Sequence, residues 1–186
     1  MATLVNVFIL SLSGLALAML IYVVARGLRT YLRARGNRLV TCPENHCVAA
    51  VELDAKGAAL KAFRGGTSPT LHECSRWPEM QGCAQECLPQ VEALGQRCLV
   101  RNIVEGWYKG KTCVYCHKPL DHATEWTGHI PALLTPASKT VSWADVPPQT
   151  LPEIFSTHQP VCWSCHIAET FRSEHPELVT DRPARW

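Results

Sequence analysis

The longest apolar run of the chain covers residues 4–25 and contains no charged residue. Only Asn6, Ser11 and Ser13 interrupt it with polar side chains. At a rise of about 1.5 Å per residue, some 20 such residues cross a hydrocarbon core of roughly 30 Å. A secretory signal peptide would have a charged start and a small-residue cleavage site after a shorter apolar core. The pattern therefore predicts a retained transmembrane helix over residues 1–25.

Beyond residue 38 the apolar positions come in short runs separated by Pro, Gly and Asn. The pattern predicts a strand, a turn and a second strand over 39–54, and a short helix over 56–63. Two short helices are expected within 83–106, where Pro89 and Gly95 interrupt the helical spacing. Further strands are expected near 132–134 and 140–143, with helices over 151–158 and 165–175, the last ended by Pro176. This order predicts a small, irregular α+β fold after the transmembrane helix.

Five arginines follow the apolar run, and no Lys or Arg precedes it. Such an excess of basic residues marks the cytoplasmic flank of a membrane helix. We therefore expect the N-terminus outside and the remaining chain in the cytoplasm, with residues 26–38 as a juxtamembrane segment at the lipid bilayer. The membrane-interface residues are Arg26, Arg29, Arg33, Arg35 and Arg38.

Composition changes this picture through cysteine. The chain has 186 residues, ten of them Cys, and a net charge of only +2, which does not indicate a nucleic-acid binder. So many cysteines usually replace part of a hydrophobic core with cross-links or metal. Their positions suggest two Cys-rich subdomains, residues 39–110 and 111–186.

The second subdomain contains two Cys-x-x-Cys pairs, in "CVYCH" at 113–117 and "CWSCH" at 162–166. Two residues between sulfurs let one tight turn present both to a single ion, and two such turns complete a tetrahedral zinc site. The segment "CVYCHKPL" resembles a zinc-ribbon knuckle, although His117 stands where a knuckle usually has Gly for a positive φ. The first predicted metal site is Cys113, Cys116, Cys162 and Cys165.

The same letters are typical of covalent haem attachment. In this alternative Cys113 and Cys116 would hold one haem c and Cys162 and Cys165 another, with His117 and His166 as iron ligands. The chain would then be a membrane-anchored dihaem cytochrome that carries electrons, on the outer side of the membrane. The arginine flank and the six further cysteines favour zinc instead.

The first subdomain carries these six cysteines. In "CSRWPEMQGCAQEC" the spacing would put Cys83 and Cys87 on one helix face. With the turn at Cys42 they suggest a second zinc site, with Cys47 or Cys98 able to replace one member: Cys42, Cys74, Cys83 and Cys87. Four thiolates could instead hold an iron–sulfur cluster, which would make the chain a redox protein.

No catalytic pattern stands out, because the chain lacks H-E-x-x-H spacing, a phosphate loop and a dinucleotide fingerprint. Closed four-cysteine sites leave no open coordination position, so we assign no catalytic residue and expect no small-molecule substrate. The sequence predicts a single-pass membrane protein with two zinc ions, whose role is structural. Its partners would be the lipid bilayer and a membrane protein complex, in which it is an accessory or assembly subunit.

Overall fold

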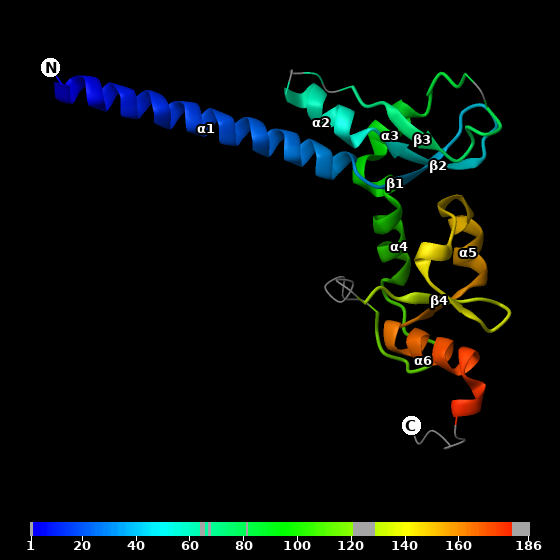
Figure 1. Ribbon diagram of the computed structural model, residues 1–186. Coiled ribbons are helices and arrows are strands. Elements are labelled where there is room, and N and C mark those ends of the chain that lie inside the picture. Colours follow the sequence, from blue (N-terminus) through cyan, green and yellow to red (C-terminus); the bar gives the residue numbers. More distant parts are fainter. Residues whose placement is uncertain (1, 64–65, 67, 81, 121–128, 180–186) are drawn as a thin grey trace. The chain divides into compact units, whose positions relative to one another are not determined.

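The computed structural model describes residues 2–63, 66, 68–80, 82–120 and 129–179. The chain forms two compact units, Met1–Leu99 and Val100–Trp186. Both mix helices with a small antiparallel sheet, so the predicted combination of one apolar helix with α and β elements is confirmed (Figure 1).

Helix α1 (Ala2–Ala34) is the longest element and extends well past the predicted end at residue 25. The most apolar 18-residue window within Val5–Ala34 has a mean hydropathy of 2.5, and none of this window is buried by the rest of the chain. By length and composition this helix can cross a membrane, as a permanent span or as a signal sequence. Figure 1 shows its N-terminal half projecting away from the other elements of unit 1.

The C-terminal part of α1 packs against α2 (Ala55–Phe63). Gly27 is buried there, and a Cβ atom at this position would lie 2.5 Å from Cζ of Phe63. Asp54 caps α2, since its Oδ1 accepts a hydrogen bond of 2.8 Å from the backbone N–H of Gly57. This packing explains why α1 stays helical beyond its apolar run.

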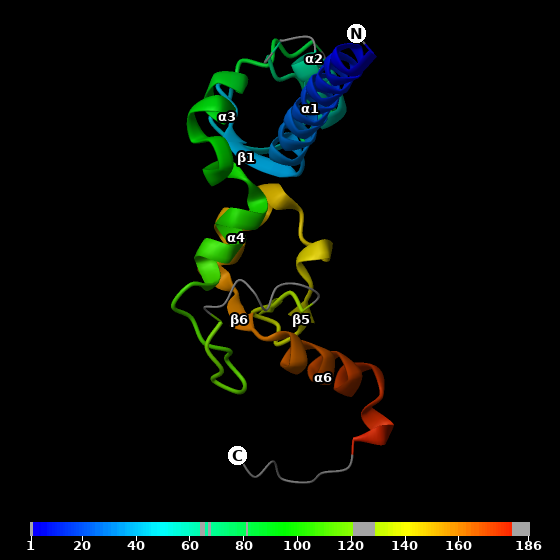
Figure 2. The same ribbon diagram turned by 90° about the vertical axis from the view of Figure 1, so that its left-hand side faces the viewer.

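The sheet of unit 1 has the strand order β1-β2-β3 and is antiparallel: β1 (Asn37–Thr41), β2 (Val48–Leu53) and β3 (Leu71–Cys74). Helix α3 (Leu88–Leu94) lies beside β1, as Figure 2 shows. Val40, Val51 and Val91 are at most 4% exposed and form the centre of the core. The predicted strand–turn–strand over 39–54 is confirmed as β1 and β2.

Arg38 differs from the other arginines of the flank, which are exposed. Its side chain is 2% exposed, and Nη1 donates to the carbonyl oxygens of Ala34 at 2.7 Å and Gly36 at 3.0 Å. Nη2 donates to the carbonyl oxygen of Arg33. The guanidinium thus satisfies carbonyls that the end of α1 leaves without helical partners. Arg38 is therefore a helix cap, which corrects its assignment to the membrane interface.

Unit 2 consists of short elements around a sheet of order β5-β4-β6. The predicted strands and the helix ended by Pro176 are confirmed, within a residue or two of the expected bounds. The elements are α4 (Val100–Tyr108), β4 (Ala132–Leu134), β5 (Thr140–Val141), α5 (Leu151–Thr157), β6 (Gln159–Val161) and α6 (Trp163–Glu174).

An aromatic cluster anchors α4 in unit 2. Trp107 stacks on Phe155 at 5.3 Å between ring centroids, and Tyr108 meets Trp143 edge to face at 6.0 Å. Tyr108 is fully buried; its hydroxyl donates to the carbonyl oxygen of Ala132 and accepts from Nε1 of Trp143. Because of these contacts the structure divides the chain between residues 99 and 100, whereas the sequence-based division kept α4 in the first subdomain.

Candidate metal centre

The first half of the centre is the tight turn at Cys113. Thr112 and Pro119 pair as an antiparallel bridge, and the backbone N–H of Cys113 donates to the carbonyl oxygen of Lys118 at 2.9 Å. His117 closes the turn by donating to the carbonyl oxygen of Cys113, with a φ of 57°. This positive φ is the conformation that the resemblance to a knuckle requires at this position. The turn therefore directs Cys113 and Cys116 to the same side.

The second half is the start of α6. Strand β6 pairs with β4, and its Val161 is fully buried, which fixes the residue that follows. Cys162 is the N-cap of α6, and Cys165 lies in the first helical turn. The first turn of a helix has free N–H groups and the positive end of the helix dipole, and both stabilise thiolates.

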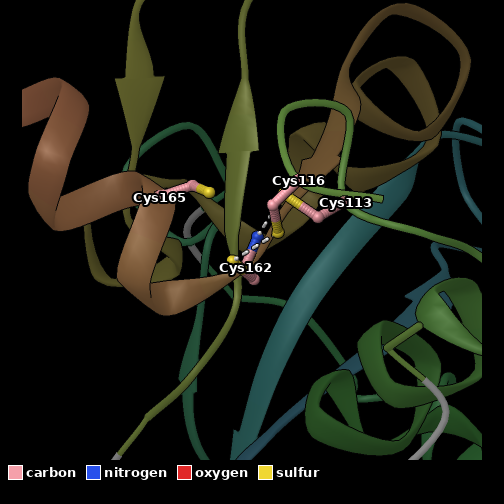
Figure 3. A group of neighbouring side chains, drawn as sticks. All are labelled: Cys113, Cys116, Cys162 and Cys165. Atoms are coloured by element: carbon pink, nitrogen blue, oxygen red, sulfur yellow. Dashed lines mark hydrogen bonds between the residues drawn. The ribbon is translucent and has the colours of Figure 1, made fainter. Parts of the chain in front are cut away.

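The two halves are joined directly. The N–H of Val114 donates to the carbonyl oxygen of Pro160 at 3.0 Å, and the N–H of Cys162 donates to Sγ of Cys113 at 3.3 Å. Sγ of Cys116 lies 3.6 Å from Sγ of Cys162. Figure 3 shows Cys113 and Cys116 on their loop facing Cys162 and Cys165 at the start of α6.

The four sulfur atoms all lie within 4.8 Å of one another. Four thiolates around a tetrahedral zinc ion, with Zn–S near 2.3 Å, place their sulfurs about 3.8 Å apart. None of the ten cysteines forms a disulfide. Cys113 is fully buried and Cys162 nearly so, whereas the other two thiols are half-buried. The cluster can therefore hold one metal ion with little rearrangement.

The surroundings of Cys113, Cys162 and Cys165 shift the pKa values of these thiols in different directions. Burial opposes ionisation of Cys113, but N–H groups of Cys162, Cys116 and Tyr115 outweigh it and lower its pKa to about 7. Burial, followed by the neighbouring thiols, raises the pKa of Cys165, and burial likewise raises that of Cys162. Cys113 is thus more readily ionised than Cys162 and Cys165.

Metal affinity should consequently depend steeply on pH. Cys162 and Cys165 have raised pKa values and must release protons when the ion binds, and Cys113 also takes up a proton below about pH 7. Lowering the pH therefore weakens binding, by at least about tenfold per pH unit. Zinc titrations of the apoprotein with a competing chelator between pH 6 and 8 measure this, and an affinity that does not change with pH would contradict it.

This arrangement does not support the two-haem alternative. Each haem c needs its own cysteine pair and a histidine on its iron, whereas here both pairs converge on one point. His117 is exposed on the turn, and His166 packs beside Trp163, with 6.0 Å between ring centroids.

Substitution of His117 tests its role as a turn residue. His117→Gly should keep the metal and change the free energy of unfolding by no more than about 1 kcal/mol, since Gly adopts a positive φ without strain. His117→Val should destabilise by about 1–2 kcal/mol, because a β-branched residue resists this conformation. Zinc content and denaturant unfolding of both variants check the prediction. Loss of the metal in His117→Gly would show that the imidazole itself is a ligand.

The early cysteines separate into two sets. The four named first as ligands line one cavity of about 420 Å³ in unit 1: Cys42, Cys74, Cys83 and Cys87. Burial raises the pKa of Cys87 first, and the charges of the other three raise it further. Cys47 and Cys98, the two possible replacements, do not line this cavity. Cys47 is exposed on the β1–β2 turn. Cys98 is buried in the core, where its Sγ donates to the carbonyl oxygen of Gly95.

Cys83 and Cys87 do not share a helix face, which corrects the sequence-based expectation. Helix α3 begins at Leu88, after Cys87, and Pro89 lies in its first turn. Gln85 between the two cysteines has a φ of 58° and so breaks helical geometry. Proline is well suited to the first turn of a helix because its missing N–H is not needed there. The i, i+4 spacing therefore spans a loop that ends at a helix start.

Sequence reasoning missed Arg76, whose Nη1 donates to Sγ of Cys42 at 3.3 Å. The N–H of Glu44 is the strongest of the influences that lower the pKa of Cys42, and Arg76 adds to it. The available signal was a basic residue two positions after Cys74, too weak to distinguish from an ordinary surface arginine.

Comparison with protein-family models, with curated proteins and with solved structures gives no match to this chain. Function is therefore argued from the chain's own residues.

Proposed function

We propose that this protein is a single-pass membrane protein in which Cys113, Cys116, Cys162 and Cys165 hold one zinc ion, and that it serves as a structural subunit of a membrane complex. The observation that supports the proposal is the mutual approach of the four sulfur atoms within 4.8 Å. They come from two segments more than 40 residues apart, so the ion would fasten the turn at Cys113 to the start of α6.

Zinc suits this donor set better than other common ions. Four thiolates in tetrahedral array select zinc or iron–sulfur, whereas calcium and magnesium require oxygen ligands. With sulfurs this close, a single ion fills the space between them. A site with four protein ligands is closed, so the ion would stabilise the fold and leave no coordination position for substrate.

The position of the site in the chain supports a structural role. Helix α6 begins at the ligands and exposes Ile167 and Phe171 one turn apart, at 47% and 49% exposure. An ion at Cys162 and Cys165 would fix the orientation of this helix. We assign such a fixed apolar face to contact with a partner protein in the membrane complex.

The flank of α1 supports the proposed membrane side. Arg26, Arg29, Arg33 and Arg35 remain exposed after the correction of Arg38. Four basic residues on one flank favour its cytoplasmic placement. A reducing cytoplasm would keep the zinc thiolates available.

Metal analysis of the purified full chain tests the zinc proposal. Elemental analysis should find about one zinc ion per chain bound to unit 2. Cys116→Ser and Cys165→Ser should each lose that ion, whereas the matched control Cys47→Ser, in an exposed turn of unit 1, should keep it. Zinc content that is the same in all four proteins would overturn the proposal.

Thiol labelling in intact cells tests the membrane side independently. Cys47 is exposed, so a membrane-impermeant maleimide should label it only after lysis if the cysteine-rich units are cytoplasmic. The double variant Cys47→Ser/Cys83→Ser gives the background, because both exposed thiols are removed. Labelling before lysis would place these units outside, and release of the protein from membranes by alkaline carbonate would contradict a membrane span.

A further inference from the structure

The turn at Cys42 in unit 1 repeats the metal-binding turn of unit 2. The N–H of Cys42 donates to the carbonyl oxygen of Cys47 at 2.9 Å, and the N–H of His46 donates to the carbonyl oxygen of Cys42 at 2.9 Å. His46 has a φ of 56°, against 57° for His117. Thr41 pairs with Val48, as Thr112 pairs with Pro119. The segments "TCPENHCV" and "TCVYCHKP" therefore share the same turn hydrogen bonds and a positive φ at the same position.

The two turns also lower the pKa of their first cysteine through the same kind of contact. The N–H groups of Tyr115 and Cys116, two and three residues after Cys113, contribute to lowering its pKa. The N–H groups of Glu44 and Asn45, at the matching positions after Cys42, lower the pKa of Cys42. Asn45 stands where unit 2 has Cys116, and its Oδ1 accepts a hydrogen bond from the N–H of Cys47. The turn in unit 1 is thus built to hold one thiolate and offers no second sulfur at the usual position.

Three other segments of unit 1 supply sulfurs to the same cavity. Cys74 ends β3, Cys83 lies in the following loop and Cys87 is the N-cap of α3. All three line the cavity of about 420 Å³ together with Cys42. Apolar side chains complete the wall, among them Trp77, Met80 and Leu71. Cysteines from four separate segments therefore meet at one cavity.

The spacing of these thiols differs from that in unit 2. In unit 2 the four cysteine sulfurs all lie within 4.8 Å of one another. Among the described residues, no other group of three or more Cys, His, Asp or Glu side chains has its ligand atoms this close together. The four sulfur atoms of Cys42, Cys74, Cys83 and Cys87 thus do not all lie within 4.8 Å of one another. In an iron–sulfur cluster the thiolates bind different iron atoms around an inorganic core, so their sulfurs lie farther apart than around a single ion.

Two of the cysteine sulfurs accept hydrogen bonds that could stabilise a cluster, although Glu44 and Glu86 also line the cavity. Arg76 donates to Sγ of Cys42 at 3.3 Å, and the N–H of Gln85 donates to Sγ of Cys83 at 3.4 Å. Gln85 reaches this position because of its positive φ, and its Oε1 accepts from the N–H of Leu71 at 3.1 Å. Hydrogen bonds to cysteine sulfurs and a neighbouring cation are the means by which proteins stabilise iron–sulfur clusters.

We propose that unit 1 binds an iron–sulfur cluster through Cys42, Cys74, Cys83 and Cys87, in addition to the zinc site proposed for unit 2. Arg76 is a positioning residue that holds the Cys42 thiolate toward the cluster. The chain then contains one structural metal site and one site of redox character, joined to a membrane helix.

The test uses the full chain in detergent, purified without oxygen and reconstituted with ferrous iron and sulfide. The wild-type protein should gain iron and acid-labile sulfide in equal amounts, a broad visible absorption, and a paramagnetic signal after reduction with dithionite. Cys83→Ser should lose all three, and because Cys83 is exposed the variant should still fold. Cys87→Ser should behave in the same way. The matched control Cys47→Ser, from the same turn as Cys42 but outside the cavity, should behave as wild type.

The outcomes separate this inference from the zinc proposal. Zinc bound at unit 2 should stay unchanged in Cys83→Ser, and the cluster should stay in Cys165→Ser if that variant folds. A second zinc ion that disappears in Cys83→Ser, without sulfide in the wild type, would overturn the cluster. Equal iron and sulfide in wild type and Cys83→Ser would overturn the ligand assignment.

Arg76→Met should keep the iron content but lower the reduction potential, since a cation next to a ligand sulfur favours the reduced state. An unchanged potential would contradict the role given to Arg76.

Discussion

Cys113→Ser is expected to abolish metal binding in unit 2 and to unfold unit 2 while unit 1 stays folded. Cys113 is fully buried at the point where the two cysteine pairs meet, and the N–H of Cys162 donates to its sulfur. Structural zinc sites contribute about 10–16 kcal/mol in small peptides, as much as the entire stability of an ordinary domain. Loss of such a site cannot be compensated by the rest of this unit.

The small core of unit 2 explains the size of this effect. Its strands β4, β5 and β6 have two or three residues each. Sheets this short are marginal without further support. Leu133, Leu151 and Val161 are almost completely buried, but few other aliphatic side chains join them among the described residues. Small units of this kind depend on metals or cross-links for stability.

Hydrogen exchange, read separately for the two units, measures the outcome. In Cys113→Ser, and in wild-type protein treated with a strong chelator, amides of residues 100–120 and 129–179 should lose protection. Amides of β1 and β2 should keep theirs in Cys113→Ser. The matched control is Cys98→Ser, which removes a buried thiol of unit 1 instead. Retained protection and zinc in Cys113→Ser would contradict both the site and its structural role.

Arg38→Met is expected to cost about 3 kcal/mol of stability in unit 1. The substitution keeps an apolar stem but removes the charged donors that serve the carbonyls of Arg33, Ala34 and Gly36. Hydrogen bonds to charged groups contribute about 1.5–3 kcal/mol, and carbonyls left buried without partners add to the loss. Burial lowers the pKa of Arg38, with the charge of Cys98 acting in the opposite direction.

Hydrogen exchange of the β1 and β2 amides at increasing denaturant concentration, in detergent, measures this loss for unit 1. Arg35→Met is the matched control, because Arg35 is exposed on the same flank and should change stability by less than about 0.5 kcal/mol. Equal effects of the two substitutions would show that the guanidinium of Arg38 does not cap α1. A larger effect of Arg35→Met would indicate that the exposed arginines matter through the detergent or lipid headgroups.

Local pattern predicted much of the secondary structure. The apolar run, the strand–turn–strand pattern over residues 39–54 and Pro176 indicated the main helices and strands, although α1 continues to Ala34, beyond the predicted end at residue 25. Two local errors have physical causes. Cys83 and Cys87 have helical spacing but belong to a loop, because Pro89 sets the helix start. In the sequence Arg38 looks like one more arginine of the flank. The chain turns at Gly36, with a φ of 99°, and this turn brings the Arg38 side chain back to the end of α1.

The candidate sites could be predicted only in part. Cys-x-x-Cys turns are local, so the sequence indicated two turns able to present thiols, but the same letters also suit haem. Sequence comparison within the chain could have found the repeat of "TC" and His at 41–46 and 112–117. Asn45 stands where the second copy has Cys116, so the first copy lacks the Cys-x-x-Cys spacing. The repeat is therefore hard to recognise from the letters alone.

The sequence by itself determined which residues could form a membrane helix, which could form short strands and helices, and which thiols could serve as ligands, since these depend on neighbours along the chain. Only the tertiary structure decided how the thiols are grouped. The hydrogen bond from the N–H of Val114 to the carbonyl oxygen of Pro160 in β6 brings the Cys113 turn to Cys162. Packing of β3 and α3 around β1 and β2 brings four other cysteines to the wall of one cavity. Long-range contacts of this kind depend on side-chain packing, which residue spacing does not encode.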